Sequence, residues 1–129
     1  MSEFYWAAGQ GDQWLAQLTG LEAMMKEIDE PLLDALSFPA VAADAPIRIA
    51  DIASGGGGTT FEIEALVPPS SVIHGFDISS ALVESANARA QKQSQRATFE
   101  TANLQTAAVP NQLYDYVVSR FGVMFFDEP

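Results

Sequence analysis

The stretch Asp51-Ile52-Ala53-Ser54-Gly55-Gly56-Gly57-Gly58-Thr59-Thr60 carries four consecutive glycines in a chain of 129 residues. It follows a short apolar run, residues 47–52, that is typical of a buried strand. It precedes a plausible helix, residues 59–67, which two prolines would end. Glycines let a backbone pass close to a ligand, and the amides at the start of a helix point toward that ligand. The sequence therefore predicts a ligand-binding loop between a strand and a helix.

The segments after this loop alternate between strand-like and helix-like patterns. Further strands are predicted at residues 72–77, 97–101 and 113–119. Between the first two of these, Ser79 or Ser80 can cap a helix that runs to about Lys92. Strands that alternate with helices indicate a parallel sheet built from right-handed crossovers. The predicted fold class is therefore α/β, with about four parallel strands.

The residues before this sheet have a helical pattern instead. Asp12 can cap a helix whose apolar residues recur every three or four positions and so share one face: Trp14, Leu15, Leu18, Leu21, Met24, Met25 and Ile28. Pro31 fits the first turn of a second short helix that ends at Leu36, and residues 37–46 predict a linker because they hold two prolines and no clear period. We therefore divide the chain into an N-terminal helical cap and linker, residues 1–46, and a sheet domain, residues 47–129.

The composition excludes several classes of function. Seventeen acidic and six basic side chains give a net charge of −11, which disfavours contact with nucleic acid and with anionic membranes. The chain has no cysteine, so thiol nucleophiles and zinc-thiolate sites are excluded, and the single His74 is expected to be a strand residue, packed or partly exposed. We expect no metal site. We also expect a cytoplasmic protein, because the N-terminus lacks the pattern of a secretory signal and no apolar run reaches the length of a membrane span.

The glycine-rich loop narrows the choice of ligand. It contains no lysine, so it is not the phosphate loop of nucleotide hydrolases. Gly55 and Gly57 match two positions of the dinucleotide-binding fingerprint, but Thr60 stands at the third. Asp77, at the end of the predicted second strand, can accept two hydrogen bonds from a ribose diol. That feature suits both NAD and S-adenosylmethionine, and Asp77 can equally be a helix-capping or solvent-facing acid.

Four segments, in order, resemble the motifs of class I S-adenosylmethionine-dependent methyltransferases, in the group similar to the ubiquinone/menaquinone-biosynthesis and small-molecule methyltransferases. The family's acid-x-Gly-x-Gly-x-Gly appears at residues 51–57, with Ala53 in place of the first glycine. The strand-end acid appears as Asp77 in residues 75–79, and the third motif, usually acidic, appears as Asn103-Leu104. Residues 114–126 resemble the family's fourth strand and the loop after it. Tyr5-Trp6 and Trp14 also look like this family's cap over the cofactor, although singly they are better explained as core residues.

The resemblance implies S-adenosylmethionine as cofactor and S-adenosylhomocysteine as product. It places the methionine portion at the backbone of residues 53–57, the ribose at Asp77 and the adenine near residues 78, 103 and 104. It puts the Ser119 carbonyl near the cofactor's sulfonium, and it implies that Asp51 stabilises the amino end of the cofactor's methionine portion. The implied cofactor-binding residues are Asp51, Ala53, Ser54, Gly55, Gly57, Asp77, Ile78, Asn103, Leu104 and Ser119. It names no catalytic residue.

The resemblance also implies an incomplete Rossmann-like methyltransferase sheet, because the family normally has seven strands and this chain ends after the predicted fourth. We therefore expect a partial S-adenosylmethionine-binding domain that acts with a small-molecule methyl acceptor and binds the cofactor weakly, without full activity. The alternatives are a non-catalytic interaction module and a nicotinamide-binding domain.

The predicted fourth strand would then lie at the edge of the sheet. Its backbone groups would be unpaired on one side, and the apolar tail at residues 121–126 would be uncovered. We expect a homodimer that pairs these strands and buries both tails about a two-fold axis. The alternative is a monomer whose tail folds over its own sheet.

Overall fold

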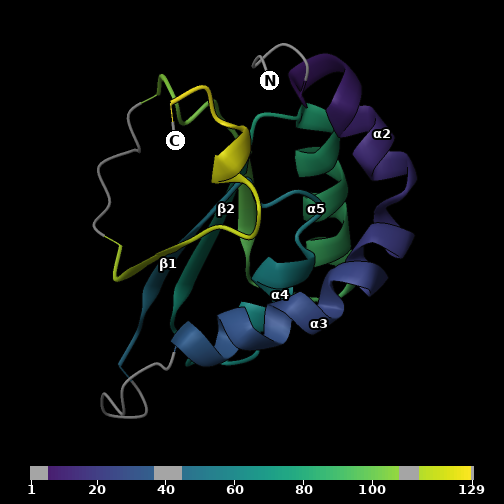
Figure 1. Ribbon diagram of the computed structural model, residues 1–129. Coiled ribbons are helices and arrows are strands. Elements are labelled where there is room, and N and C mark those ends of the chain that lie inside the picture. The colour runs from purple at the N-terminus through teal and green to yellow at the C-terminus, as the bar shows by residue number, and fades with distance from the viewer. Residues whose placement is uncertain (1–5, 37–44, 108–113, 129) are drawn as a thin grey trace.

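Four parallel strands form the centre of the molecule. The computed structural model describes residues 6–36, 45–107 and 114–128 (Figure 1). The strands are β1 (Arg48–Ile52), β2 (Val72–Asp77), β3 (Thr98–Thr101) and β4 (Tyr116–Val118), and their order in the sheet is β3-β2-β1-β4. All three pairings are parallel. The predicted α/β class and the four parallel strands are confirmed.

The strand order reverses at β1, because β2 lies on one side of it and β4 on the other. In open sheets of this kind, ligands bind at the carboxyl ends of the strands where the order reverses. The glycine-rich loop follows β1 directly and therefore lies at this switch point. The fold therefore places the predicted loop at the position where sheets of this kind bind ligands.

The helices are stacked on one face of the sheet, as Figure 1 shows. They are α4 (Gly58–Glu64) and α5 (Ser80–Lys92), next to the strands, and α2 (Gly11–Ala16) and α3 (Leu18–Leu36), which pack on α5 and α4 respectively. Two short elements complete the chain, the π-helix Trp6–Gln10 and the 3-10 helix Val123–Phe125. None of the described helices is both long enough and apolar enough to cross a membrane.

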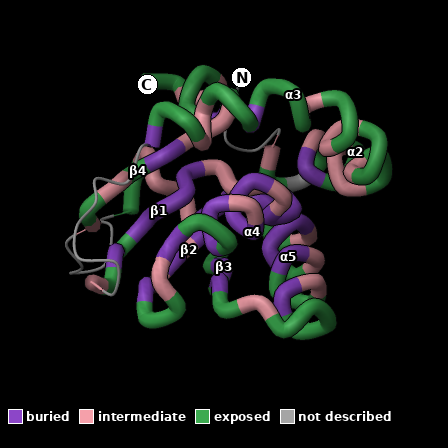
Figure 2. The backbone as a smooth tube through the Cα atoms, turned by 90° about the horizontal axis from the view of Figure 1, so that it is seen from below, coloured by how far each residue is buried: buried purple, intermediate pink, exposed green. Residues whose placement is uncertain are grey.

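Two apolar clusters, one on each face of the sheet, make up the core. Figure 2 shows the buried stretches of β1, β2 and α5 between which they lie. Successive side chains of a strand point to opposite faces, so Ile49 packs toward the helices while Ala50 and Ile52 pack on the other side. The helix-side cluster is the larger and includes Ile63, Ile73, Ala86, Phe99 and Val118. The smaller cluster joins Ala50, Ile52 and Phe76 to partly buried residues, namely Ala102, Leu104, Tyr114 and Phe126.

Several local predictions are confirmed. β2 has the predicted bounds, and Ser79 is the N-cap of α5, where its hydroxyl accepts a hydrogen bond from the Leu82 amide at 3.3 Å. His74 is a half-buried strand residue, with Nδ1 2.9 Å from the Tyr114 hydroxyl. α4 is shorter than predicted and ends at Glu64. Most of the predicted linker, Tyr5 and the first residue of the predicted fourth strand lie outside the described residues.

The N-terminal predictions need two corrections. Asp12 is not a cap, because Gln10 precedes α2 in helical conformation and the π-helix runs into α2 without a capping turn. Pro31 does not begin a second helix but lies inside the 19-residue α3. A proline removes one backbone donor from a helix. Contacts on both sides of it hold α3 together, since Asp29 and Leu36 are both buried.

The predicted apolar face of the N-terminal helix is also interrupted. Gln17 separates α2 from α3, and Met24 and Ile28 are exposed. The helical period therefore located the helices but overstated how much of that face is buried.

Candidate functional site

The loop after β1 is held in a tight conformation. The Ser54 amide donates to the Phe76 carbonyl at 3.0 Å, and the Gly57 amide donates to the Ser54 carbonyl at 3.1 Å. Gly57 caps α4 with a φ of 90°, a region that side chains rarely adopt. Ala53 has a φ of 56° at the position where the resembled motif has glycine. The backbone conformation therefore matches the glycine pattern, and Ala53 adopts it at some cost in strain.

Asp77 joins this loop to the end of β2. Its Oδ2 accepts a hydrogen bond from the Gly55 amide at 2.8 Å, and its Oδ1 accepts one from the Ser79 amide at 2.9 Å. The side chain is buried, and this burial raises its pKa while the backbone hydrogen bonds oppose the rise. A carboxylate has about four lone-pair sites, so Asp77 keeps acceptor capacity after these two bonds.

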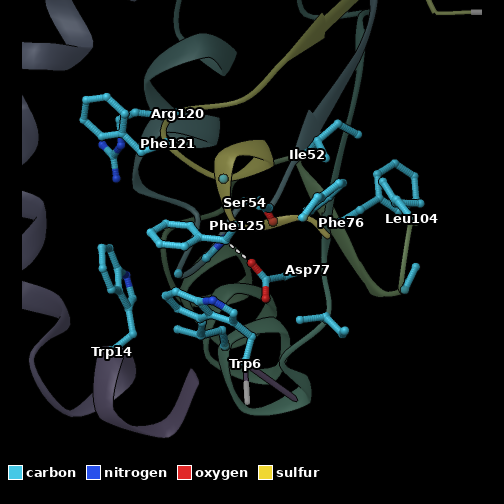
Figure 3. A pocket seen from close by; sticks show the side chains of 18 of the residues that line it. Trp6, Trp14, Ile52, Ser54, Phe76, Asp77, Leu104, Arg120, Phe121 and Phe125 are labelled. Atoms are coloured by element: carbon cyan, nitrogen blue, oxygen red, sulfur yellow. Dashed lines mark hydrogen bonds between the residues drawn. The ribbon is translucent and has the colours of Figure 1, made fainter. Parts of the chain in front are cut away.

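A pocket opens beside this loop and is drawn in Figure 3. Its walls come from the N-terminal helices, the loop after β1, the ends of β2 and β3, and the segment after β4. Seven of the predicted cofactor-binding residues line it: Ala53, Ser54, Gly55, Asp77, Ile78, Asn103 and Leu104. The remaining three, Asp51, Gly57 and Ser119, are not among the lining residues.

These three residues have other contacts. Asp51 is only 2 % exposed and accepts a hydrogen bond from the Thr60 hydroxyl at 2.7 Å. Burial raises the pKa of Asp51 to about 7, although the Thr60 hydroxyl and Arg120 lower it. The Ser119 hydroxyl donates to the Ile52 carbonyl at 2.8 Å, and Gly57 caps α4. All three residues make contacts within or beside the loop and do not line the pocket.

Aromatic rings from the two ends of the chain form one wall of the pocket. Trp6 and Phe125 have ring centroids 5.0 Å apart, and Trp6 and Trp14 have centroids 6.0 Å apart. We call these three residues the aromatic wall. The sequence singled out both tryptophans and included Phe125 in the fourth motif, but no sequence pattern predicted that the three rings would meet.

An ion pair ties α3 to the segment after β4. Arg120 contacts both carboxylate oxygens of Asp29, at 2.7 and 2.8 Å, and the Thr59 hydroxyl donates to the same carboxylate at 3.0 Å. Asp29 is buried, and Arg120 lines the pocket. The nearby Glu62 has one buried carboxylate oxygen without a hydrogen-bond partner among the described residues. Burial is the main cause that raises the pKa of Glu62, and the negative charge of Asp29 raises it further. No local sequence pattern predicts this pair, because its members are 91 positions apart.

The described residues contain no cluster of side chains that could hold a metal ion. The site therefore combines a tight backbone loop, a strand-end carboxylate and an apolar aromatic wall. This set of groups can bind a molecule that has a polar part with hydroxyls and a flat apolar part.

Comparison with known proteins adds to this geometry. The family described as "Methyltransferase domain" matches residues 49–129. The plantazolicin methyltransferase BpumL, solved in complex with SAH, superposes with a TM-score of 0.71 at 16 % identity over 98 % of this chain and 48 % of that chain. The magnesium protoporphyrin IX methyltransferase ChlM of Synechocystis PCC 6803, solved with bound SAH, gives 0.62 at 18 % identity over 89 % and 54 %.

A third solved structure is a putative S-adenosyl-L-methionine-dependent methyltransferase from Methanococcus maripaludis, with a TM-score of 0.64 at 18 % identity over 84 % of this chain and 51 % of that chain. At these identities the superpositions establish the fold. The chain spans about half the length of these three proteins. The search of curated proteins gave no match.

Proposed function

The chain belongs to the class I S-adenosylmethionine-dependent methyltransferase family, and on this premise we propose that its pocket binds S-adenosylmethionine and the product S-adenosylhomocysteine. The reaction proposed for the protein is methyl transfer to a small molecule. Because the chain spans about half the length of its structural relatives, it contributes the cofactor-binding part of that activity.

The position of Asp77 carries this proposal. It ends β2, lines the pocket and is hydrogen-bonded to the glycine-rich loop at the switch point of the sheet. A buried carboxylate with spare acceptor sites beside a tight loop suits a ribose diol. This supports the ribose assignment that the resemblance implied.

Buried polar atoms at the pocket support the same ligand. Ser54 Oγ and Trp6 Nε1 are buried and have no hydrogen-bond partner among the described residues. Buried polar groups are usually hydrogen-bonded, and Ser54 Oγ lies beside Gly75 of β2, so of these two atoms Trp6 Nε1 is the one that favours a polar ligand in the pocket. Packing against the protein itself requires glycine at position 56, because a Cβ there would lie 2.4 Å from the Leu18 side chain. The carboxylate of Asp77 and the unpaired Trp6 Nε1 support the cofactor assignment.

The chain's own residues would divide the work of binding. The loop backbone would hold the methionine portion, Asp77 the ribose, and Ile78, Asn103 and Leu104 the adenine. Asn103 Oδ1 accepts from the Gln105 amide at 3.1 Å and keeps a second lone pair for an adenine amino group. When bound, the cofactor supplies an electrophilic methyl group on a positively charged sulfur. Residues that only position such a group still account for much of the rate, because positioning lowers the entropic part of the barrier.

Titration calorimetry with S-adenosylhomocysteine tests the proposal. Asp77→Ala should weaken binding about 10- to 100-fold, which corresponds to the roughly 1–3 kcal/mol for leaving buried polar groups unpaired. Asp34→Ala is the matched control, because it removes an exposed carboxylate that does not line the pocket. Equal affinity of wild type and Asp77→Ala would refute the role of Asp77. Tighter binding of NAD than of S-adenosylhomocysteine would refute the cofactor.

We also propose that the chain forms a homodimer through β4 and the segment after it. β4 is an edge strand that pairs with β1 alone among the described residues. Four of the large exposed apolar side chains gather here: Val117, Phe121, Val123 and Met124. Burial of each is worth roughly 1.5–3 kcal/mol. The charge of −11 per chain opposes association but is screened within about 8–10 Å at physiological salt.

Light scattering after size exclusion tests this assembly in moderate salt at tens of micromolar. The wild type should have the mass of two chains, and Val117→Lys should shift it toward one. Leu66→Lys is the control, since Leu66 is also exposed but lies after α4. A wild-type mass of one chain would mean that the tail covers the edge by itself.

A further inference from the structure

We propose that the aromatic wall binds a flat, uncharged, aromatic methyl acceptor. The inference rests on the proposed function, because it assumes that the cofactor occupies the loop side of the pocket. Figure 3 shows Trp6, Trp14 and Phe125 on one side of Asp77, with Leu104 on the other. The cofactor assignment uses the loop, Asp77 and the Leu104 side. Trp14 borders the loop, because its Nε1 lies 3.8 Å from where a Cβ of Gly55 would be. The part of the wall left to the acceptor is therefore that of Trp6 and Phe125.

The charge of the acceptor follows from how the pocket's charged side chains are engaged. Glu22 is paired with Arg89 at 2.7 Å, and Arg120 is paired with Asp29 at 2.7 Å. Asp77 accepts two backbone hydrogen bonds, and its remaining acceptor sites are the ones assigned to the cofactor's ribose. No other charged side chain lines the pocket in the described part of the chain. A charged acceptor would therefore lose water without gaining a free counter-charge, which is costly.

The cofactor and the whole chain act against charge of either sign. The cofactor carries a positive sulfur, so a cationic acceptor in the same pocket is repelled. A protonated amine also lacks the lone pair that accepts a methyl group. The sulfonium attracts an anionic acceptor, but the net charge of −11 repels it, and Arg120, the one cationic side chain among the described lining residues, is already paired with Asp29. A neutral acceptor avoids all three penalties.

The rings themselves favour an aromatic acceptor over a saturated one. The Trp6 and Phe125 planes meet at 55°, and those of Trp6 and Trp14 at 61°. Aromatic rings prefer stacked or edge-to-face partners, so a flat ring can stack on one face while meeting the edge of another. A saturated ring of the same size gains the same burial but no such pairing.

One hydrogen-bond donor on this wall has no partner. Trp6 Nε1 is buried and unpaired among the described residues. An indole nitrogen donates and cannot accept. If the Trp6 ring turns this nitrogen toward the pocket on binding, an acceptor with one hydrogen-bond acceptor atom on its ring system, such as a phenolic oxygen or a heteroaromatic nitrogen, gains a partner there.

Calorimetry with four probes of one skeleton tests the inference on the chain saturated with S-adenosylhomocysteine. The probes are 2-naphthol, 2-naphthoate, 2-naphthylmethylammonium and decahydro-2-naphthol, which share the fused two-ring carbon skeleton and differ in the substituent and its charge or in the saturation of the rings. We expect 2-naphthol to bind at least tenfold more tightly than each of the others. Trp6→Leu should weaken its binding at least tenfold, and Trp6→Phe should restore part of that loss because it keeps a ring without the N–H group. Leu66→Ala, an exposed residue outside the pocket, should leave it unchanged.

The outcomes separate this inference from the proposed function. Tightest binding of the ammonium or the naphthoate, or equal binding of naphthol and its saturated form, would overturn the inference while cofactor binding stands. Naphthol binding that is lost when S-adenosylhomocysteine is present would also overturn it, because the wall would then belong to the cofactor site. Failure of S-adenosylhomocysteine to bind refutes the proposed function by itself and takes with it the premise of this inference.

Discussion

Replacing the buried Asp51 with asparagine should raise stability and flatten its dependence on pH. Asp51 is 2 % exposed on the helix side of β1, where it accepts a hydrogen bond from the Thr60 hydroxyl. The groups that face it are Arg120, which lowers its pKa, and Asp77 and Asp29, which raise it. An asparagine has nearly the same shape, and its amide oxygen can still accept the Thr60 hydrogen bond.

The size of the effect follows from the pKa of Asp51. Burial raises it from 3.8 to about 7 in the folded protein. An acid whose folded pKa is raised stabilises the fold below its unfolded pKa, and this stability is lost as pH rises through the folded value. At about 1.4 kcal/mol per pH unit, the ionised carboxylate costs about 4 kcal/mol above about pH 8. About half of that, roughly 2 kcal/mol, develops between about pH 5.5 and 8.5.

Urea unfolding of wild type and Asp51→Asn across that pH range measures this cost directly. This pH range stays above the isoelectric point of about 4.1, because near that point the uncharged chain would tend to associate. The free energy of unfolding of the variant should exceed that of wild type by an amount that grows by roughly 2 kcal/mol from the acid to the alkaline end. Titrating groups that do not interact with Asp51 are shared by both proteins and cancel in the difference. Asp34→Asn, which changes an exposed acid, should give a constant difference near zero. Parallel curves for wild type and Asp51→Asn would show that Asp51 does not titrate in this range.

Two further substitutions test the loop conformation and the ion pair beside the pocket. Gly57→Ala should lower the free energy of unfolding by about 1–3 kcal/mol in urea titrations. The residue has a φ of 90°, and a Cβ there would lie 2.8 Å from the Phe99 ring. An unchanged urea midpoint would contradict this loop conformation. Arg120→Met should cost about 3–5 kcal/mol, because it leaves the buried Asp29 carboxylate without its partner. The double variant with Asp29→Asn should recover most of that loss, and simple additivity of the two single changes would argue against a direct interaction.

The sequence alone determined the order of the strands and helices after residue 46 and the location of the glycine-rich loop. The glycine run, the apolar strands beside it and the capping Ser79 act over a few residues, and such local signals are readable without a fold. The strand-end position of Asp77 also follows from the sequence, because β2 was predicted with its observed bounds. Most of the residues that line the pocket beside the loop were likewise predicted from the sequence.

The tertiary structure alone decided what faces that loop. Asp29 and Arg120 are distant in the sequence, and Trp6 and Phe125 come from opposite ends of the chain. No local pattern predicts such meetings, because they arise only when β4 pairs beside β1 and brings the C-terminal segment against the N-terminal helices. Pro31 shows the same limit from the other direction. Its local rule predicted a helix start, but burial of residues on both sides kept α3 continuous, since tertiary packing outweighs a single unfavourable backbone position.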